Sequence, residues 1–172
     1  MEDLILDTET TGLGINAEII EIALIGAETG DIYLDTLVKP LSPIPADAMA
    51  IHGITNEDVA NSPAWGDVYK QFCELIKDRV IHIYNADYDV RLVSQTCALY
   101  NLKDPDIDAN CVMLKYAELY REEDNYRGGW KWQSLSNAML QQDIDVSDIK
   151  AHRASADCEM TRRLLRKIQI ER

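Results

Sequence analysis

The sequence predicts an α/β domain whose central sheet contains both antiparallel and parallel strands. Segments rich in Ile, Leu and Val open the chain and form a hairpin, and helical and strand-like segments alternate after Ser62. The chain has 172 residues, of which 47% are hydrophobic and 27% charged, an ordinary balance for one globular core. We therefore expect residues 1–172 to form a single domain.

Three extended segments begin the chain. The first is an apolar run that ends in polar residues and a glycine-rich turn, and the next two form a hairpin around Thr29-Gly30. The predicted strands are Leu4–Asp7, Glu18–Ala27 and Asp31–Val38. A short helix near Ala46–Ile51 follows the Pro-punctuated stretch after Pro40.

Helices and short strands alternate in the rest of the chain. Ser62-Pro63 is typical of a helix start, with serine as N-cap and proline at the first position. The predicted helices are Ala64–Lys77, Tyr88–Leu102, Cys111–Glu122, Ser134–Gln142 and Arg153–Ile170, and the predicted strands are Val80–Tyr84 and Ile107–Asp108. The polar segment Arg121–Lys131, with two glycines in succession, predicts a mobile loop.

Charge and composition exclude several classes of protein. The net charge is −13, from 30 acidic and 17 basic residues, which argues against a protein that clamps a long duplex with a basic face. An enzyme that holds only a strand end stays possible, because bound divalent cations reverse the local field. No apolar run is long enough to cross a membrane, the start lacks a signal peptide, and the four cysteines have no metal or disulfide spacing, so we expect a cytoplasmic protein with free thiols.

Two carboxylates interrupt the first strand. Asp7 and Glu9 are two residues apart, so their side chains leave the same face, directly after the apolar run Leu4–Leu6. Two such carboxylates repel each other unless a cation lies between them. A solvated strand end is the alternative interpretation, and the pair alone does not decide between the two.

Two further acids lie on apolar helix stripes. Leu92, Val93, Thr96 and Cys97 continue the face that begins at Asp89, and Met160, Thr161, Leu164, Leu165 and Ile168 continue the one that begins at Asp157. Each could be a hydrogen-bonded structural aspartate. Four acids of this kind, without matching basic partners, instead indicate divalent cations, Mg²⁺ or Mn²⁺, of which two would clamp a phosphoryl displacement. His152, five residues before Asp157, can accept a proton beside such a site.

These residues resemble three motifs of one nuclease family. Asp7-Thr8-Glu9-Thr10-Thr11-Gly12-Leu13, Tyr84-Asn85-Ala86-Asp87-Tyr88-Asp89 and His152-x-Ala154-x-x-Asp157 occur in the order found in the DEDDh (DnaQ-like) exonucleases, which include polymerase proofreading subunits, ribonuclease T and oligoribonuclease. His52-Gly53-Ile54-Thr55 resembles the segment that connects these motifs. The likeness runs from about Leu4 to Leu165.

The resemblance implies a ribonuclease H-like fold, with a mixed sheet of about five strands flanked by helices, and two-metal hydrolysis. By motif position, the metal ligands would be Asp7, Glu9, Asp89 and Asp157, the general base His152, and the contacts to the terminal nucleotide Thr10, Leu13, His52 and Tyr88. In the second motif Tyr84 replaces the usual histidine and Tyr88 the usual phenylalanine, which removes no ligand but leaves substrate preference open.

The expected activity is metal-dependent removal of nucleotides from a 3′ end, of single-stranded DNA or else RNA, as nucleoside 5′-monophosphates. The alternative is an exonuclease-like scaffold subunit of a polymerase or another nucleic-acid-processing complex. An aspartyl-phosphatase is disfavoured because Glu9 stands where that chemistry needs aspartate. Pathway, oligomeric state and a polymerase partner stay open.

Four further residues are interpreted without a catalytic role. Glu21 is interpreted as structural, in an edge strand or near the sugar, and His82 as a sheet residue. Trp130 and Trp132 are either a local cap or a pair that stacks on bases.

Overall fold

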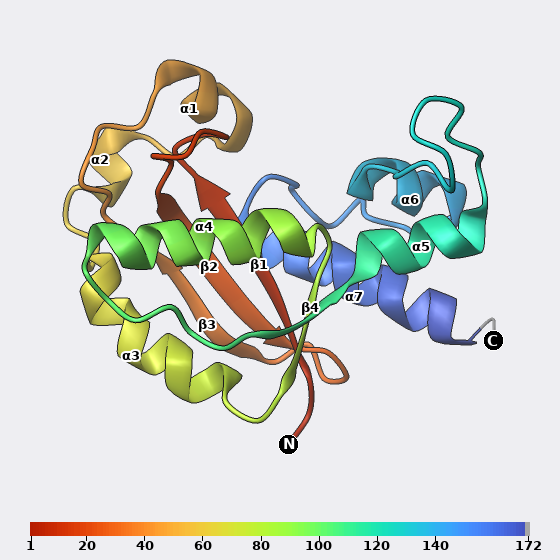
Figure 1. Ribbon diagram of the computed structural model, residues 1–172, viewed down its shortest axis with the longest axis horizontal. Helices are drawn as coiled ribbons and strands as arrows, with labels where there is room; N and C mark the ends of the chain where they lie inside the picture. The colour runs from red at the N-terminus through yellow and green to blue at the C-terminus, as the bar shows by residue number, and fades with distance from the viewer. Residues whose placement is uncertain (171–172) are drawn as a thin grey trace.

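The computed structural model describes residues 1–170 and has a mixed five-stranded sheet flanked by helices (Figure 1). The strands are β1 (Leu4–Thr10), β2 (Ile19–Gly26), β3 (Ile32–Leu37), β4 (Val80–Ile83) and β5 (Asp108–Cys111). They lie in the order β3-β2-β1-β4-β5. The first three pair antiparallel, whereas β4 and β5 run parallel to β1, so the predicted fold class is confirmed.

The helices follow the predicted alternation. They are α1 (Ala46–His52), α2 (Asn56–Val59), α3 (Trp65–Ile76), α4 (Ala86–Leu99), α5 (Val112–Tyr120), α6 (Leu135–Gln141) and α7 (Ala154–Ile170). None of the helices within residues 1–170 has the length and apolar character needed to cross a membrane. All four cysteines are free thiols, as expected.

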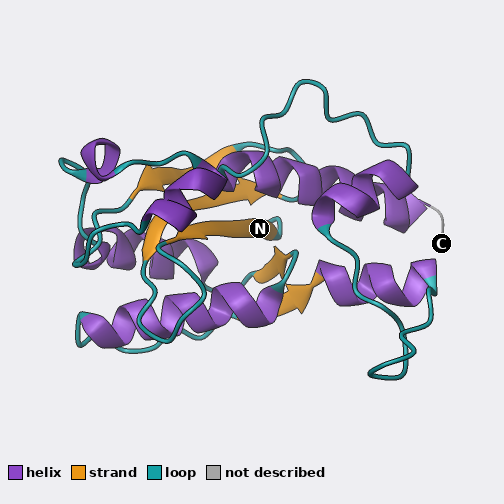
Figure 2. Cartoon of the chain, turned by 90° about the horizontal axis from the view of Figure 1, so that it is seen from above, coloured by secondary structure: helices purple, strands orange, loops and turns teal. Residues whose placement is uncertain are grey.

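Alternating residues of the central strands bury the two faces of the sheet against different helices. Leu4 and Leu6 of β1 belong to one core with Trp65 of α3 and Leu92 of α4. Ile5 belongs to a second core with the start of α7. Figures 1 and 2 show the sheet between these two layers of helices. The polar residues 7–10 in the second half of β1 therefore alternate between the face covered by α7 and the face covered by α4.

A third core joins the C-terminal helices to one another. Tyr116 of α5, Met139 of α6 and Leu164 of α7 are buried together, with Tyr84 at the end of β4. This cluster extends the molecule beyond the sheet, to the right in Figure 1.

Several element boundaries differ from the predictions. Strand β1 continues to Thr10, so Asp7 and Glu9 lie within a paired strand and not at its end. The Ser62-Pro63 helix start is wrong, because the N–H of Lys39 donates to the carbonyl of Pro63 and Lys39 forms a bridge with Ala64, which keeps this segment outside the helix. Helix α3 instead has Ala64 at its N-cap. The predicted ends of α4, α5 and β5 are off by up to three residues, the usual uncertainty of such boundaries.

Candidate active site

Consecutive residues of β1 direct their side chains to opposite faces of the sheet. Asp7 pairs across the ladder with Ala23, which packs with Ala154 and Cys158 of α7, so Asp7 and Glu9 face that helix. Thr8, between them, faces α4. The alternation that buries Leu4–Leu6 thus places the two carboxylates together on one side.

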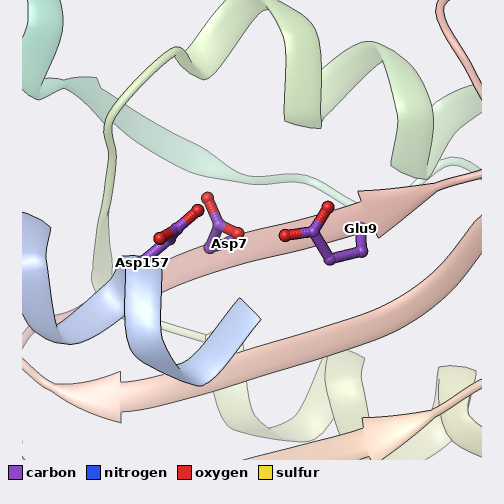
Figure 3. A group of neighbouring side chains, drawn as sticks. All are labelled: Asp7, Glu9 and Asp157. Carbon is purple, nitrogen blue, oxygen red and sulfur yellow. The ribbon is translucent and has the colours of Figure 1, made fainter. Parts of the chain in front are cut away.

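Asp157 completes a group of three carboxylates. It lies in the first turn of α7, and one oxygen from each of Asp7, Glu9 and Asp157 lies within 4.8 Å of the other two. Figure 3 shows the three side chains converging between β1 and the start of α7. Three oxygens at this spacing can hold a hard divalent cation.

Asp89 approaches from the opposite face. It lies in the first turn of α4, only 4% of its surface is exposed, and its Oδ1 accepts a 2.7 Å hydrogen bond from the hydroxyl of Thr8. The predicted stripe from Asp89 through Leu92, Val93, Thr96 and Cys97 is buried throughout. Asp89 is therefore outside the group of three, although its charge contributes to the raised pKa of Asp7.

Burial disfavours the charged forms of all four acids, and repulsion among the carboxylates adds to this effect at Asp7 and Glu9. Burial, followed by the neighbouring carboxylates, raises the pKa of Asp7 well above its usual range. The same causes raise the pKa of Glu9 to about 8. Burial raises the pKa of Asp89 to about 7, and it also raises that of Asp157.

In the described part of the chain no ion pair compensates this cost, and Arg153 and His152 offset it only in part, at Glu9 and Asp157. Within residues 1–170, no lysine, arginine or histidine forms an ion pair with Asp7, Glu9, Asp89 or Asp157. Carboxylate oxygens that converge without an ion-pair partner fit a divalent cation, whose own charge would lower these pKa values again.

His152 lies at the edge of this group, in the loop before α7. Its backbone has a left-handed conformation, with φ of 65°, and its N–H donates to Oδ1 of Asp157 at 3.3 Å. The side chain is exposed, and the hydrogen bond from the backbone of His152 offsets part of the rise that burial causes in the pKa of Asp157. The structure thus places His152 beside the carboxylates, as the sequence predicted.

An ion pair between buried Glu21 and exposed Arg153 fixes the loop that carries His152. Glu21 on β2 pairs across the ladder with Glu9, is 1% exposed, and accepts hydrogen bonds from the guanidinium of Arg153 and from the N–H of Ala154 at 2.9 Å. Its structural interpretation is confirmed, but its placement in an edge strand is wrong because β2 lies between β3 and β1. Sequence analysis missed Arg153, and its only signal was its place next to His152.

A cavity of about 510 Å³ opens beside Glu9. Its lining includes all four residues predicted to contact a nucleotide, Thr10, Leu13, His52 and Tyr88. The structure therefore brings the predicted contacts together, although they come from three separate segments. Ile51 of α1, which sequence analysis did not select, also lines the cavity, and 64% of its surface is exposed.

Hydrogen bonds fix the shape of this cavity. The hydroxyls of Thr10 and Tyr88 lie 2.7 Å apart, and that of Tyr88 also donates to the carbonyl of Gly12 at 3.1 Å. The phenol that replaces phenylalanine in the second motif therefore holds the loop after β1. His52 is buried, and its Nδ1 accepts from the N–H of Ile54, which leaves the proton of the neutral ring on Nε2.

The remaining residues singled out by sequence lie away from the carboxylates. The hydroxyl of Tyr84, which replaces the usual histidine, donates at 2.8 Å to the carbonyl of Gln133. His82 is 6% exposed within β4 and pairs with Asp3 at 3.3 Å, which confirms it as a sheet residue.

The known proteins that are similar to this chain agree with the acidic site described above. The model of the RNase T exonuclease family matches residues 4–165. The chain belongs to this exonuclease family. It is 48% identical over 164 residues to the uncharacterized exonuclease CP81 of Escherichia phage 186, covering 92% of this chain and 83% of the phage protein.

Polymerase subunits and solved nucleases are also similar to the chain. The DNA polymerase III subunit epsilon of Pasteurella multocida is 32% identical over 166 residues, 91% of this chain, and the chain spans 64% of that subunit's length. A structure of exonuclease X in complex with 5′ overhanging duplex DNA superposes with a TM-score of 0.75 at 29% identity, over 98% of this chain and 91% of that one. The nuclease domain of a DEDDh family member bound to rAMP superposes at 0.77 with 18% identity, over 97% and 91%, which shows the fold alone.

The family model and the phage relative confirm the predicted exonuclease family and the enzyme class, an exonuclease hydrolase, and the superposed structures confirm the ribonuclease H-like fold. The family is dependent on divalent metal, in agreement with the acidic group.

Proposed function

We propose that the chain removes nucleotides from the 3′ end of a single nucleic-acid strand, DNA first and RNA as the alternative, as nucleoside 5′-monophosphates. The observation that carries the proposal is the group of Asp7, Glu9 and Asp157, whose oxygens lie within 4.8 Å of one another and of which Glu9 also lines the cavity. A strand end in the cavity would place its last phosphodiester against the carboxylates.

Asp7, Glu9 and Asp157, with Asp89 on the other side, would hold two divalent cations, Mg²⁺ or Mn²⁺. Two such ions supply a water nucleophile at neutral pH and stabilise the attacking and leaving oxygens of a phosphoryl displacement. The chain's own part is to fix these oxygens, through the β1 ladder and the first turns of α4 and α7.

His152 would take the proton from the attacking water. Its place in an exposed loop lets the imidazole face the scissile phosphate and return the proton to solvent. Arg153 and Glu21 hold that loop to β2, so they position His152 without contacting the reacting atoms.

The cavity would bind the terminal nucleoside. Leu13 and Tyr88 offer apolar contacts to the base and sugar, and Thr10 and His52 offer hydrogen bonds. The loop after β1 and helix α1 both contribute to the lining of the cavity, an arrangement that would suit an open chain end. This favours attack at an end over attack within a strand.

The experiment uses oligonucleotides of DNA and of RNA labelled at the 5′ end and incubated with Mg²⁺ or Mn²⁺. The expected result is a ladder of products that shortens from the 3′ end, is lost with a chelator, and is blocked by a 3′-terminal phosphate. Internal fragments from a 3′-blocked strand would contradict the proposal. Absence of cleavage by folded, metal-supplied protein would favour a scaffold role beside a polymerase, which the likeness to epsilon subunits also suggests.

A further inference from the structure

The segment between α5 and α6, residues 121–132, forms an arm whose two sides are hydrogen-bonded to each other. Glu123 and Trp130 form an antiparallel bridge, and the N–H of Lys131 donates to the carbonyl of Glu122 at 2.7 Å. Gly128 and Gly129, each with φ of 75°, make the turn that reverses the chain. The segment predicted to be a mobile loop is thus a short hairpin.

A buried polar network fixes the base of the arm. Gln133 is 4% exposed, and its carbonyl accepts from the hydroxyl of Tyr84 at 2.8 Å. Its side chain donates to Glu122 at 2.8 Å and accepts from Gln141 of α6 at 3.0 Å. Tyr84 immediately precedes Asn85, which lines the cavity, so the base of the arm is bonded to the segment that leads into the candidate site.

The arm displays aromatic rings that the fold does not bury. Of the three tryptophans, Trp65 is fully buried, whereas Trp132 is 50% exposed and Trp130 39%. Tyr126, at the tip, is completely exposed. Large aromatic side chains that gather on a surface indicate a binding site, because folding normally buries such side chains.

Each tryptophan of the arm lies against an arginine. The guanidinium of Arg127 is 4.8 Å from the ring centre of Trp132, and that of Arg121 is 5.9 Å from the ring centre of Trp130. A stacked arginine leaves the second face of the ring open to a base and keeps its own N–H donors for a phosphate. Two such pairs provide stacking and charge together, the combination that binds single strands without sequence preference.

The charge of the remaining surface argues for a single strand over a duplex. The net charge of −13 is unfavourable for binding along a long duplex, which usually requires a basic face. The acids of the arm are largely engaged, Glu122 by Lys131 and Gln133, and Asp124 by the backbone of the turn. In Figure 1 the arm projects at the upper right, beyond α5, whereas α1 lies at the upper left, so only a strand that runs along the molecule can reach from the cavity to the arm.

We propose that the arm, residues 121–132, is a stacking platform for the unpaired bases several nucleotides upstream of the scissile bond. The proposal rests on the proposed function, because the cavity at α1 would hold the terminal nucleoside and the rest of the strand would leave toward the arm. The arm then favours substrates long enough to reach it.

The test compares strands of about three and about twelve thymidines, a range that spans the usual site size of a stacking surface. In the Trp132→Ala variant we expect KM for the longer strand to rise about tenfold, the effect typical of one lost base stack, with kcat unchanged. KM for the shorter strand should stay as in the unsubstituted protein. Arg127→Ala, which leaves both rings in place, should act in the same direction. Ile32→Ala, which removes an exposed apolar side chain from the distant strand β3, is the matched control.

A second measurement does not depend on turnover. With a chelator present, the longer strand should quench the emission of Trp130 and Trp132, while buried Trp65 gives a constant background and the shorter strand has little effect. If neither strand is cleaved, the proposed function fails and this titration alone decides about the arm. The proposal would be overturned if the ratio of KM for the longer strand to KM for the shorter strand were the same in the variants as in the unsubstituted protein, or if the longer strand caused no quenching. Either result would leave a protein partner as the ligand of the arm.

Discussion

Replacing Glu9 with glutamine should stabilise the metal-free protein at neutral and alkaline pH while it removes activity. The folded protein raises the pKa of Glu9 from 4.5 to about 8, through burial and the charges of nearby carboxylates. Between these two values the folded protein keeps a proton that the unfolded chain has released. The free energy of unfolding therefore falls as pH rises through this window, and the loss ends above the folded pKa.

One such group changes the free energy of unfolding by about 1.4 kcal/mol per pH unit. From pH 6 to pH 7.5 the loss is about 2 kcal/mol, which corresponds to a fall of about 4–8 °C in Tm for a chain of this size. Glu9→Gln removes this titration, and it also relieves the repulsion that raises the pKa of Asp7. The curve of Tm against pH should therefore be flatter in the variant.

Thermal melting in a chelator, followed by circular dichroism across this pH range, measures the difference. Leu13→Ala, which removes a neutral and exposed side chain from the cavity, should keep the slope of the unsubstituted protein. Saturating Mg²⁺ should raise Tm more at pH 7.5 than at pH 6, because the cation binds the deprotonated carboxylates. Parallel curves for Glu9→Gln and Leu13→Ala would refute the reasoning.

Three further predictions concern the loop before α7 and the cavity. His152→Ala should lower kcat by about 10²–10⁴-fold with little change in KM, as steady-state kinetics would show, and a change in KM alone would contradict a proton-transfer role. Arg153→Ala should also lower kcat, with partial recovery on addition of guanidinium, whereas a higher KM with a weaker salt dependence would mean that Arg153 binds phosphate. Tyr88→Phe should loosen the loop after β1 by removing the hydroxyl bonded to Thr10 and Gly12, and should raise KM at constant kcat in a titration with short strands.

The sequence revealed those parts of the site that depend on local periodicity. A carboxylate on an apolar helix stripe, as at Asp89 and Asp157, differs from the apolar residues around it and can be recognised within twelve residues of chain. The two-residue spacing of Asp7 and Glu9 places them on one face of any strand. For the same reason the order of strands and helices could be predicted closely.

Features that depend on packing between distant segments were not predictable. Glu21 and Arg153 are 132 residues apart, and nothing local to either one identifies its partner. The hydroxyl of Thr8 donates a hydrogen bond to Asp89 only because β1 and the first turn of α4 meet in the folded chain. Likewise Ser62 has the local signal of a helix cap, but the bridge between Lys39 and Ala64 overrides it.

The most direct test of the central claim measures metal binding and turnover in Asp157→Asn. Asparagine keeps an oxygen that can accept the hydrogen bond from the N–H of His152, so the variant removes the charge with little change to the loop. Calorimetric titration with Mn²⁺ should detect two ions per chain in the unsubstituted protein and fewer in the variant, with cleavage of a 5′-labelled strand reduced at least about 10³-fold. Normal cleavage by folded Asp157→Asn, or cleavage by the unsubstituted protein in a chelator, would contradict the account.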